Sequence, residues 1–435
     1  MRKPDWISVD AAVQRILEAV APLPPEDIPL SAAVGRTLAE DIVSPIDHPP
    51  WDNSAMDGFA VRAEDVRGAS REAPVSLHVI EEVAAGAFPT KIVGSGQAIR
   101  IMTGGPVPEG ADGVVRIEHT AVGEDGRIRI LDDMDAGRNV RPRGEDVRTG
   151  ERLFSSGRRL RPGEIGILAS VGCGRVSVRR QAQVALLATG DELVDIDGFE
   201  EVRSGRRIVN SNSHALAAAV RTAGGQPVDL GIARDDPAHV RALTARGIGA
   251  DALVTTAGAS VGDHDVVKDA LGTLGLEVVF WRVTMRPGSP VSFGTLPRAD
   301  GSRLPVFGLP GNPVSALVTF DVLVRPALRR MHGRTDIFGR TVRVRAAERM
   351  SSTAKLTHFL RVTLEPAEDG VALARLTGGQ GSGILSSVAR ADALLVVPLG
   401  ASVLEEGELA TALLLPAPDD GQERPGYNAG APNNR

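Results

Sequence analysis

The sequence predicts a multidomain protein of the α/β plus β class, and three observations support this prediction. The chain has 435 residues, too many for one core at roughly 150 residues per domain. Residues 183–331 alternate short apolar runs with helical patterns, as a doubly wound, mostly parallel sheet requires. The segments on either side show two-residue alternation or short Val/Ile runs broken by glycine, which favours smaller β-rich domains.

Composition and charge exclude several classes of protein. The formal net charge is -6, so no global positive field attracts nucleic acid or an anionic membrane. The single Cys173 allows neither an internal disulfide nor a cysteine-based zinc cluster, which suits a reducing cytoplasm. The first ten residues lack the apolar stretch of a signal peptide, and no apolar run approaches the ~20 residues that cross a bilayer. We therefore expect a cytoplasmic protein with no nucleic-acid or membrane partner.

The chain is expected to open with an amphipathic helix that has Ser8 as its N-cap. Its apolar residues fall on one helical face: Val9, Val13, Ile16, Leu17 and Val20. We assign residues 1–45 and 148–180 to a discontinuous N-terminal linker domain of helix and strand. Between these two segments, glycine punctuates short Val/Ile runs, and we predict an inserted β-rich domain over residues 46–147.

Residues 181–332 form the predicted α/β domain. The run QVALLAT from Gln183 is typical of a buried strand, and a helix over 212–223 is stopped by Gly224 and Gly225. The remaining predicted elements, in order, are strand QPVDLGIA, helix 237–246, strand DALVTTA, helix 266–274, strand LEVVFWRV, strand PVFGL and helix 314–331.

Residues 333–416 are predicted to form a small β-barrel or sandwich, because five segments alternate apolar and polar residues. These segments are TVRVRAAERM, HFLRVTLEP, GVALARL, ADALLVVPL and GELATALLL. Residues 417–435 are polar and rich in chain breakers, so we predict a disordered tail.

Three loops that follow predicted strands are the candidate ligand loops, because ligands of open α/β sheets bind beyond the carboxyl ends of the strands. They are TGDEL (189–193), GASVGDHD (258–265) and LPGNPVSA (309–316). Their glycines allow close approach of backbone N–H groups to a phosphate. The third loop leads into a predicted helix whose N-terminus, with the Ser315 hydroxyl, favours an anion.

The same sheet edge carries carboxylates that predict a Mg²⁺ site, because this ion binds a few carboxylates together with water and substrate phosphate. The pairs are Asp191 and Glu192, Asp235 and Asp236, and Asp263 and Asp265. For any one of these residues, a capping or loop role is the stronger interpretation. Their convergence on one edge supports the metal site.

Arginines offer a second kind of ligand group. Arg282 and Arg286, in RVTMRPGSP, could hold an oxyanion through their forked donors, or pair with surface acids. The arginine-rich stretch 138–161 is interrupted by acids and nearly free of aromatics, so we interpret it as a solvated or interdomain charge network. Histidine spacing gives no zinc motif, and neither a G-x-S-x-G nor a P-loop pattern is present.

Six motifs occur in order and together resemble the MoeA family of molybdopterin molybdenumtransferases, which is also similar to the C-terminal domain of gephyrin. They are DNSAMDGFA (52–60), RIMTGGPVPEGAD (100–112), RPRGEDV (141–147), ATGDEL (188–193), SVGDHD (260–265) and LPGNPVSALVTF (309–320). The resemblance extends from about Ser8 to Pro416.

The resemblance implies an elongated homodimer with a MoCF-like α/β domain. That domain would face the inserted and C-terminal domains of the other subunit. The implied substrates are adenylated molybdopterin and molybdate, with Mg²⁺ as cofactor and AMP as product. The implied partners are the molybdopterin adenylyltransferase and proteins that mature molybdoenzymes.

Carried over residue by residue, the resemblance implies catalytic roles for Asp57, Thr103, Asp146, Glu192, Asp235 and Asp265, of which the last three would bind the metal. For Asp57 and Thr103, a turn or capping role is the alternative. The expected cofactor-binding residues are Gly190, Ser260, Gly262, Asp263, Arg282, Arg286, Pro310, Gly311, Asn312, Pro313, Ser315 and Arg361. Ser382 and Ser386 are weaker matches.

The chain departs from the family pattern at four positions. Arg282 and Arg286 stand where the family usually has lysine, and Ser289 removes a cation from the usual KPGKP motif. Ala259 stands in GASVGD where the family usually has GGVSVGD. Ser289 and Ala259 prompt one alternative to the transferase, a noncatalytic dimeric pterin-binding scaffold or carrier. The related α/β domain gives a second alternative, a molybdopterin adenylyltransferase.

Overall fold

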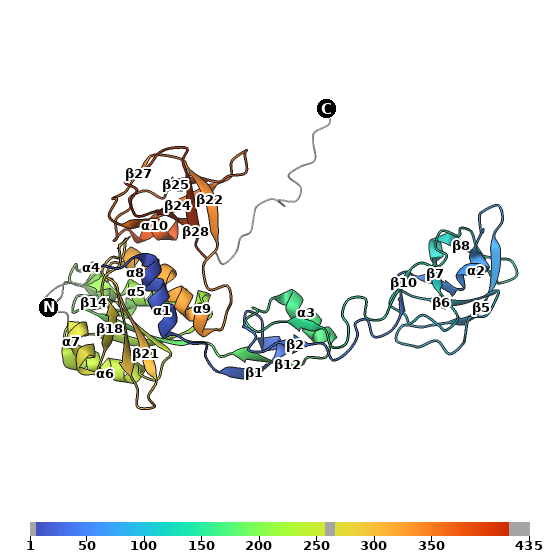
Figure 1. Ribbon diagram of the computed structural model, residues 1–435, viewed down its shortest axis with the longest axis horizontal. Helices are drawn as coiled ribbons and strands as arrows, with labels where there is room; N and C mark the ends of the chain where they lie inside the picture. Colours follow the sequence, from blue (N-terminus) through green and yellow to red (C-terminus); the bar gives the residue numbers. More distant parts are fainter. Residues whose placement is uncertain (1–5, 257–265, 417–435) are drawn as a thin grey trace. The chain divides into compact units, whose positions relative to one another are not determined.

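The computed structural model describes residues 6–256 and 266–416, which fall into two compact units (Figure 1). Unit 1 comprises residues 1–26, 35–37 and 178–435, and unit 2 comprises residues 27–34 and 38–177. The predicted disordered tail, 417–435, lies outside the described residues. In the described ranges, no helix has both the length and the apolar content to cross a membrane.

Unit 1 opens with helix α1 (Val9–Ala19), as the sequence predicts. The Ser8 hydroxyl accepts a hydrogen bond from Ala11 N at 3.2 Å, which satisfies one of the free N–H groups of the first turn. Ala12 and Ile16 are fully buried. They belong to the core that α1 shares with the long helical segment 313–331.

The α/β domain of unit 1 contains a six-stranded sheet in the order β16-β13-β17-β21-β20-β18. The first four strands are parallel, and β20 is antiparallel to both of its neighbours, so the prediction of a mostly parallel sheet is confirmed. The strands are β13 (Gln183–Thr189), β16 (Gln226–Ala233), β17 (Ala252–Thr256), β18 (Glu277–Phe280), β20 (Ser292–Pro297) and β21 (Arg303–Leu309).

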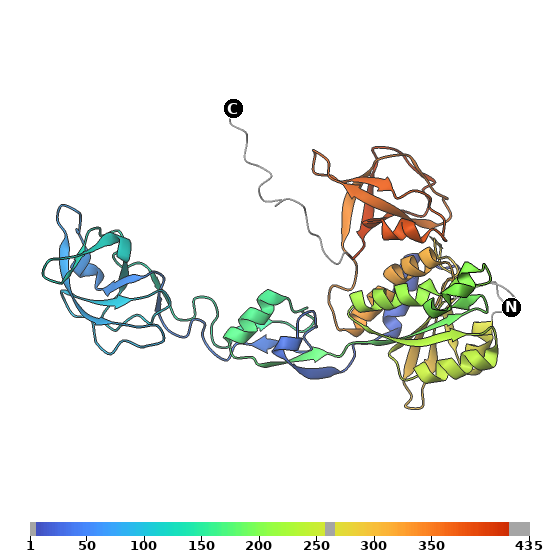
Figure 2. The ribbon, with the colours of Figure 1, turned by 180° about the vertical axis from the view of Figure 1, so that it is seen from behind.

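Helices cover both faces of this sheet (Figures 1 and 2), because successive side chains of the central strands point to opposite faces. Val184 and Leu186 pack into the core of α1, α5 and α8. Ala185 and Leu187 pack instead against α6 and α7. The helices are α5 (Ser211–Thr222), α6 (Pro237–Gly247), α7 (Val266–Thr273), α8 (Pro313–Thr319) and α9 (Arg325–Met331).

Besides short elements, a strand and a helical irregularity of this domain were not predicted. Strand β20 was missed because Gly294 interrupts its apolar run. Gly294 is needed there, since a Cβ at this position would lie 2.6 Å from Glu277 O. The predicted helix 314–331 is continuous but contains a π-helical turn, η4 (Phe320–Val324), between α8 and α9. Pro326, which cannot donate a backbone hydrogen bond, follows this turn.

The C-terminal domain, also in unit 1, is a closed barrel, as predicted. Its five strands form a ring because β24 pairs with both β25 and β26. Strand β19 (Met285–Arg286) of the α/β domain adds to β24 in parallel, which joins the two domains. The ring consists of β22 (Thr341–Ala346), β24 (Thr357–Glu365), β25 (Leu373–Leu376), β26 (Ala393–Val397) and β28 (Leu409–Leu414).

Unit 2 contains the predicted inserted β-rich domain, a six-stranded sheet in the order β7-β4-β6-β5-β9-β8. Phe59, Leu77 and Ile130 are buried in its core. The strands are β4 (Gly58–Val61), β5 (Val75–Glu82), β6 (Gln97–Ile101), β7 (Gly113–Arg116), β8 (Thr120–Val122) and β9 (Ile128–Ile130).

Short elements complete both units. In the linker region, two-stranded ribbons pair β1 with β12 and β2 with β11, and a ribbon within residues 46–147 pairs β3 with β10. The shorter elements are β1 (Pro25–Pro29), η1 (Leu30–Ala32), β2 (Ile42–Val43), β3 (Asn53–Ser54), α2 (Ala63–Val66), η2 (Ile117–His119), β10 (Val140–Arg141), β11 (Arg152–Phe154), α3 (Pro162–Ser170), β12 (Arg175–Arg179), β14 (Leu193–Val194), η3 (Ile196–Gly198), α4 (Phe199–Arg203), β15 (Ile208–Val209), β23 (Met350–Ser351), α10 (Leu385–Ala389) and β27 (Val403–Leu404).

The arginine-rich stretch of unit 2 forms ion pairs, as the charge-network interpretation predicts. Arg143 pairs with Asp47 at 2.6 Å and Arg152 pairs with Asp41 at 3.2 Å. Arg158 and Arg161 both pair with Glu164. These arginines are therefore occupied by carboxylates of the same unit.

Candidate functional site

The carboxyl ends of β13 and β16 bring two of the predicted acidic groups together. These parallel strands are neighbours in the sheet. In the loops that follow them, Asp191 N donates to Asp235 Oδ2 and Asp235 N donates to Asp191 Oδ1, each at 3.4 Å. Glu192 and Asp235 are both exposed. This edge of the sheet therefore presents carboxylate oxygens to solvent, as the sequence predicts.

Gly190 allows the Glu192 side chain to fold back over the loop. Gly190 has a φ of 143°, which lies in a region of backbone conformation that residues other than glycine rarely adopt. A Cβ at Gly190 would lie 2.5 Å from Glu192 Oε2. A side chain at position 190 would therefore displace the carboxylate.

The central ligand loop lies outside the described residues. Ser260, Gly262, Asp263 and Asp265 all belong to the segment 257–265. In the parts of the chain that the structure describes, no three His, Cys, Asp or Glu side chains gather as a metal site would need. Asp265, the third predicted metal ligand, is not among the described residues.

The loop after β21 places several predicted binding residues at the start of α8. Pro310 and Ser315 are buried, whereas Gly311 and Asn312 are exposed. Asn212 Nδ2 donates a hydrogen bond to Gly311 O at 2.7 Å, which ties the loop to α5. Pro313 occupies the first turn of the helix, where a missing N–H group costs nothing.

The segment that contains MRPGSP crosses from β19 toward α8. Gly288 has a φ of 103°, and a Cβ there would lie 2.3 Å from Thr319 Cγ2, so only glycine allows this close approach. Arg286 is exposed on β19, and the Ser289 hydroxyl donates to Met285 O. Arg282 lies elsewhere, with its guanidinium 5.3 Å from the centre of the Trp6 ring.

Arg361 is the largest fully buried side chain of the described residues, and it has 1% of its surface exposed. Its Nε donates to Ser387 Oγ at 3.1 Å, and its Nη2 donates to Gly381 O at 3.2 Å. In the described ranges, no carboxylate pairs with it. Burial lowers the pKa of the Arg361 guanidinium from its ordinary value. A buried cation that is partnered only by neutral groups is costly unless an anion joins it.

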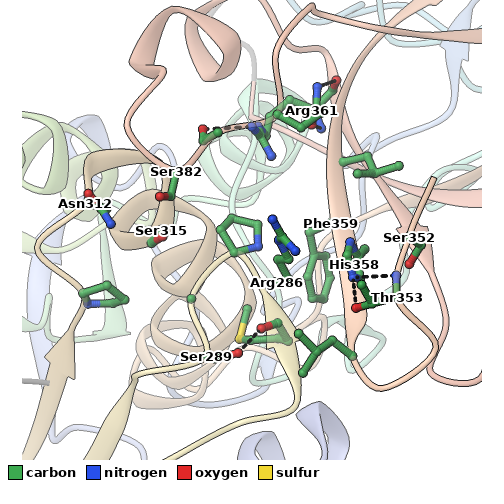
Figure 3. Close-up of a pocket in the computed structure, with 18 of the residues that line it drawn as sticks. Arg286, Ser289, Asn312, Ser315, Ser352, Thr353, His358, Phe359, Arg361 and Ser382 are labelled. Atoms are coloured by element: carbon green, nitrogen blue, oxygen red, sulfur yellow. Dashed lines mark hydrogen bonds between the residues drawn. The ribbon is translucent and has the colours of Figure 1, made fainter. Parts of the chain in front are cut away.

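Arg286 and Arg361 line one cavity of about 530 Å³ between the α/β domain and the barrel (Figure 3). Four of the other predicted residues share it, namely Pro310, Asn312, Ser315 and Ser382. No Asp or Glu belongs to its described lining. The pocket therefore combines two guanidinium groups with neutral donors, which is the chemistry of an oxyanion site. Glu192, Asp235 and Arg282 are not part of this lining.

The structure adds pocket residues that the sequence analysis missed. Ser352, Thr353 and His358 line the pocket, and Gln380 Oε1 accepts a hydrogen bond from Arg361 N at 2.9 Å. One sequence signal was available. His358 and Arg361 are polar residues inside the otherwise apolar run HFLRV, and such residues in a buried strand call for a reason.

The remaining predicted residues lie in unit 2. Asp57 Oδ1 accepts hydrogen bonds from Thr103 N at 2.7 Å and from Thr103 Oγ1 at 2.8 Å. These bonds, the backbone one first, lower the pKa of Asp57 below its usual value. Asp146 is exposed, and its N–H donates to His48 O at 3.1 Å. Unit 2 therefore presents an ionised carboxylate that is held by one threonine.

Three family models match the chain in order. They are the MoeA N-terminal region (domains I and II) over residues 7–172, a probable molybdopterin binding domain over residues 185–330, and the MoeA C-terminal region (domain IV) over residues 343–415. The second range lies within unit 1, where β13, α5 and α8 are found.

Individual proteins match over most of their length. A molybdopterin molybdenumtransferase of Nostoc sp. is 38% identical over 397 residues, which is 90% of this chain and 89% of that protein. Molybdopterin molybdenumtransferase 2 of Mycobacterium tuberculosis is 39% identical and covers 76% of this chain and 80% of its own. The solved molybdopterin biosynthesis MoeA protein of Pyrococcus horikoshii is 30% identical, with a TM-score of 0.80 over 94% of this chain and all of that one.

Proposed function

The chain belongs to the MoeA family, and from this premise we propose that it is a molybdopterin molybdenumtransferase of molybdenum cofactor biosynthesis. In the proposed reaction, adenylated molybdopterin receives molybdenum from molybdate and AMP is released. The observation that carries the proposal is the cavity lined by Arg286 and Arg361 without a carboxylate.

The pocket is suited to a tetrahedral dianion such as molybdate. Arg361 is held by Ser387 and the backbone of Gly381, so its guanidinium needs little reorganisation when an anion arrives. Arg286, on the neighbouring strand β19, supplies a second cation to the same cavity (Figure 3). Ser315 and Ser382 add hydroxyl donors. We propose that these four residues hold molybdate while the dithiolene of the pterin approaches.

The acidic edge of the sheet fits Mg²⁺ by its donor chemistry. Glu192 and Asp235 are exposed carboxylates that form no ion pair in the described ranges, and carboxylate oxygens are the ligands that Mg²⁺ prefers. We propose that they bind the ion together with Asp265. When bound, Mg²⁺ would neutralise and polarise the phosphate link of the adenylated substrate. Because Gly190 has no side chain, the space that the Glu192 carboxylate occupies stays free.

We assign Asp57, Thr103 and Asp146 to the catalytic machinery as part of the same proposal. Thr103 keeps the Asp57 carboxylate ionised and oriented, which suits a group that positions substrate or accepts a proton. Asp57→Asn keeps the size of the side chain but removes its charge. We expect this variant to fold normally and to lose activity, as measured by the rate of AMP release.

We propose that the protein is a homodimer. In unit 1, an apolar groove is lined by α1, by the segment 337–341 and by the end of β26. Phe338 is 59% exposed and Leu399 is 54% exposed, and exposed apolar patches of this kind favour protein association. Sedimentation of the native chain and of Phe338→Glu tests the proposal, because the charged side chain should shift a dimer toward monomer.

The release of AMP tests the activity. Purified protein with adenylated molybdopterin, molybdate and Mg²⁺ should release AMP, and omission of molybdate should slow that release. Glu192→Gln and Asp235→Asn should each reduce the rate, whereas Glu200→Gln, an exposed acid on α4, should not. Binding of the substrate without AMP release would favour the pterin-binding scaffold. Consumption of ATP with free molybdopterin would favour the adenylyltransferase.

A further inference from the structure

A buried imidazole on β24 lies in the oxyanion pocket and has no role in the function proposed above. His358 is 5% exposed and lines the cavity. In the parallel pairing of β19 with β24, His358 is the register partner of Arg286. The inference below concerns this residue and rests on the proposed function of the pocket.

Two hydrogen bonds fix the protonation state of this imidazole in the structure. Thr353 N donates to His358 Nε2 at 3.2 Å, and Thr353 Oγ1 lies 2.9 Å from the same nitrogen (Figure 3). A backbone N–H can only donate, so Nε2 carries no proton and the ring is neutral. Burial, and after it the charge of Arg286, lower the pKa of His358 from its ordinary value.

A neighbouring hydroxyl lacks a partner. Ser352 Oγ is buried and makes no hydrogen bond in the described structure, although Ser352 belongs to the pocket lining. Buried hydroxyls are normally satisfied, so this one points to a group that the pocket receives. Ser352, Thr353 and His358 thus form one polar corner of the cavity (Figure 3).

The charges that face this corner are unbalanced. Arg286 approaches from β19 and Arg361 from the same strand as His358, while the described lining contributes no carboxylate. A dianion in the pocket would offset the repulsion that Arg286 exerts on an imidazolium. The pKa of His358 would therefore rise when the anion binds. By reciprocal linkage, protonation of His358 would strengthen anion binding by the same factor.

We propose that His358 is the proton-accepting member of the oxyanion site, so that a tetrahedral dianion binds together with one proton. The proton comes from the acid form of the buffer, which is left as its conjugate base, and is held on His358 Nε2. Thr353 Oγ1 then accepts a hydrogen bond from that nitrogen, and Thr353 N is freed to donate elsewhere. The pocket thereby favours dianions such as molybdate, tungstate or sulfate over a monoanion of the same shape, such as perrhenate.

Calorimetric titration of the full-length protein tests this proposal. Molybdate is titrated at about pH 6 and about pH 8, in pairs of buffers that differ in protonation enthalpy. We expect an uptake of up to about one proton per anion and a dissociation constant about fivefold or more lower at the acidic pH. Sulfate, which stays dianionic over this range, repeats the measurement. Perrhenate is expected to bind more weakly and with no proton uptake.

Variants assign the proton to His358. His358→Gln retains an acceptor for Thr353 N but cannot take up a proton, so the pH dependence and the proton uptake should disappear. His358→Asn gives a second test if the first variant does not fold. His214→Gln is the matched control, because His214 is an exposed histidine that pairs with Asp195, and this variant should behave as the native protein does.

The outcomes separate this inference from the function on which it rests. Binding of molybdate without proton uptake, or an uptake that persists in His358→Gln, overturns the role of His358 and leaves the transferase standing. Absence of oxyanion binding at both pH values overturns the assignment of the pocket and the inference with it. In that case AMP release still decides whether the chain is a transferase.

Discussion

Glu164 in unit 2 and Arg361 in unit 1 are both buried charges, 4% and 1% exposed, but their surroundings differ. Glu164 accepts hydrogen bonds from the guanidinium groups of Arg158 and Arg161 and from Arg161 N. These contacts lower the pKa of Glu164 to about 2, with the side-chain bond from Arg161 as the first cause. Arg361 has only neutral acceptors, Ser387 and the carbonyl of Gly381.

The difference separates a charge that stabilises a fold from a charge that is kept for a ligand. Glu164 caps α3 and neutralises two arginines, so its interactions are complete within unit 2. The charge of Arg361 is not compensated within the described residues, and it lines a cavity. We infer that folding tolerates the cost of burying Arg361 because the bound oxyanion supplies the missing partner.

The largest expected difference between the two units is in the pH dependence of their stability, and it arises from a third buried group, His332. His332 Nε2 accepts a hydrogen bond from Ala182 N at 3.0 Å, and burial, followed by Arg334, lowers the pKa of His332 to about 4. Its ordinary value is 6.5, so the unfolded chain binds the proton first. The stabilisation is complete above pH 6.5, and about 3 kcal/mol is lost as the pH falls to 4.

The corresponding window for Glu164 is lower. Its pKa is lowered from 4.5 to about 2, so the stabilisation by Glu164 is present above pH 4.5 and is lost as the pH falls toward 2. Unit 1 should therefore weaken first on acidification. Urea unfolding followed by tryptophan fluorescence checks this, with Trp281 as the only reporter in one variant and Trp51 in another. His332→Gln should remove the acid sensitivity of unit 1 between pH 6.5 and 4; an unchanged profile would contradict the prediction.

Glu164→Ala tests whether the Glu164 charge stabilises unit 2. The substitution removes a helix cap and the shared partner of two arginines, and we expect the free energy of unfolding of unit 2 to fall by about 2 to 3 kcal/mol. Molybdate affinity should stay unchanged. Trp51 fluorescence in urea measures the first effect and calorimetry the second. Glu124→Ala, at an exposed turn of the same unit, is the control and should change neither quantity.

Arg361→Met should give the opposite result. Methionine fills the buried volume without a charge, so the loss of a charge-assisted contact should weaken molybdate binding about 30-fold, or about 2 kcal/mol. The melting temperature should stay the same or rise, because an uncompensated buried charge is removed. Arg375→Met, at an exposed arginine that pairs with Glu365, is the matched control. A large fall in stability with intact binding would make Arg361 a structural residue.

The sequence predicted the layers of the fold because its local patterns agree with its tertiary structure. The strand QVALLAT and the helix capped by Ser8 are examples. Strand β20 was missed because the need for Gly294 arises from its partner strand β18, through the close approach of Glu277 O. Local propensity contains no information of this kind.

The site was predicted in part for the same reason. Loops that follow parallel strands must meet at one edge, so Glu192 and Asp235 could be grouped from the sequence. The pocket at Arg361 depends on the docking of the barrel against the α/β domain through β19 and β24. No spacing rule joins Arg286 to His358 or Ser352. Arg286 was predicted, but His358 and Ser352 were therefore missed.

Ser289→Lys adds a third cation, beside Arg286 and Arg361, to a pocket whose described lining has no carboxylate. Ser289 lines the cavity with Arg286 and Arg361, so a lysine there should tighten molybdate binding about five- to tenfold through its charge. The loss of the hydrogen bond from Ser289 to Met285 O should lower stability by about 1 kcal/mol. Ser289→Met controls for side-chain length, and Ser302→Lys, at an exposed turn, controls for net charge. A binding isotherm that is unchanged by the lysine would mean that position 289 does not face the bound anion.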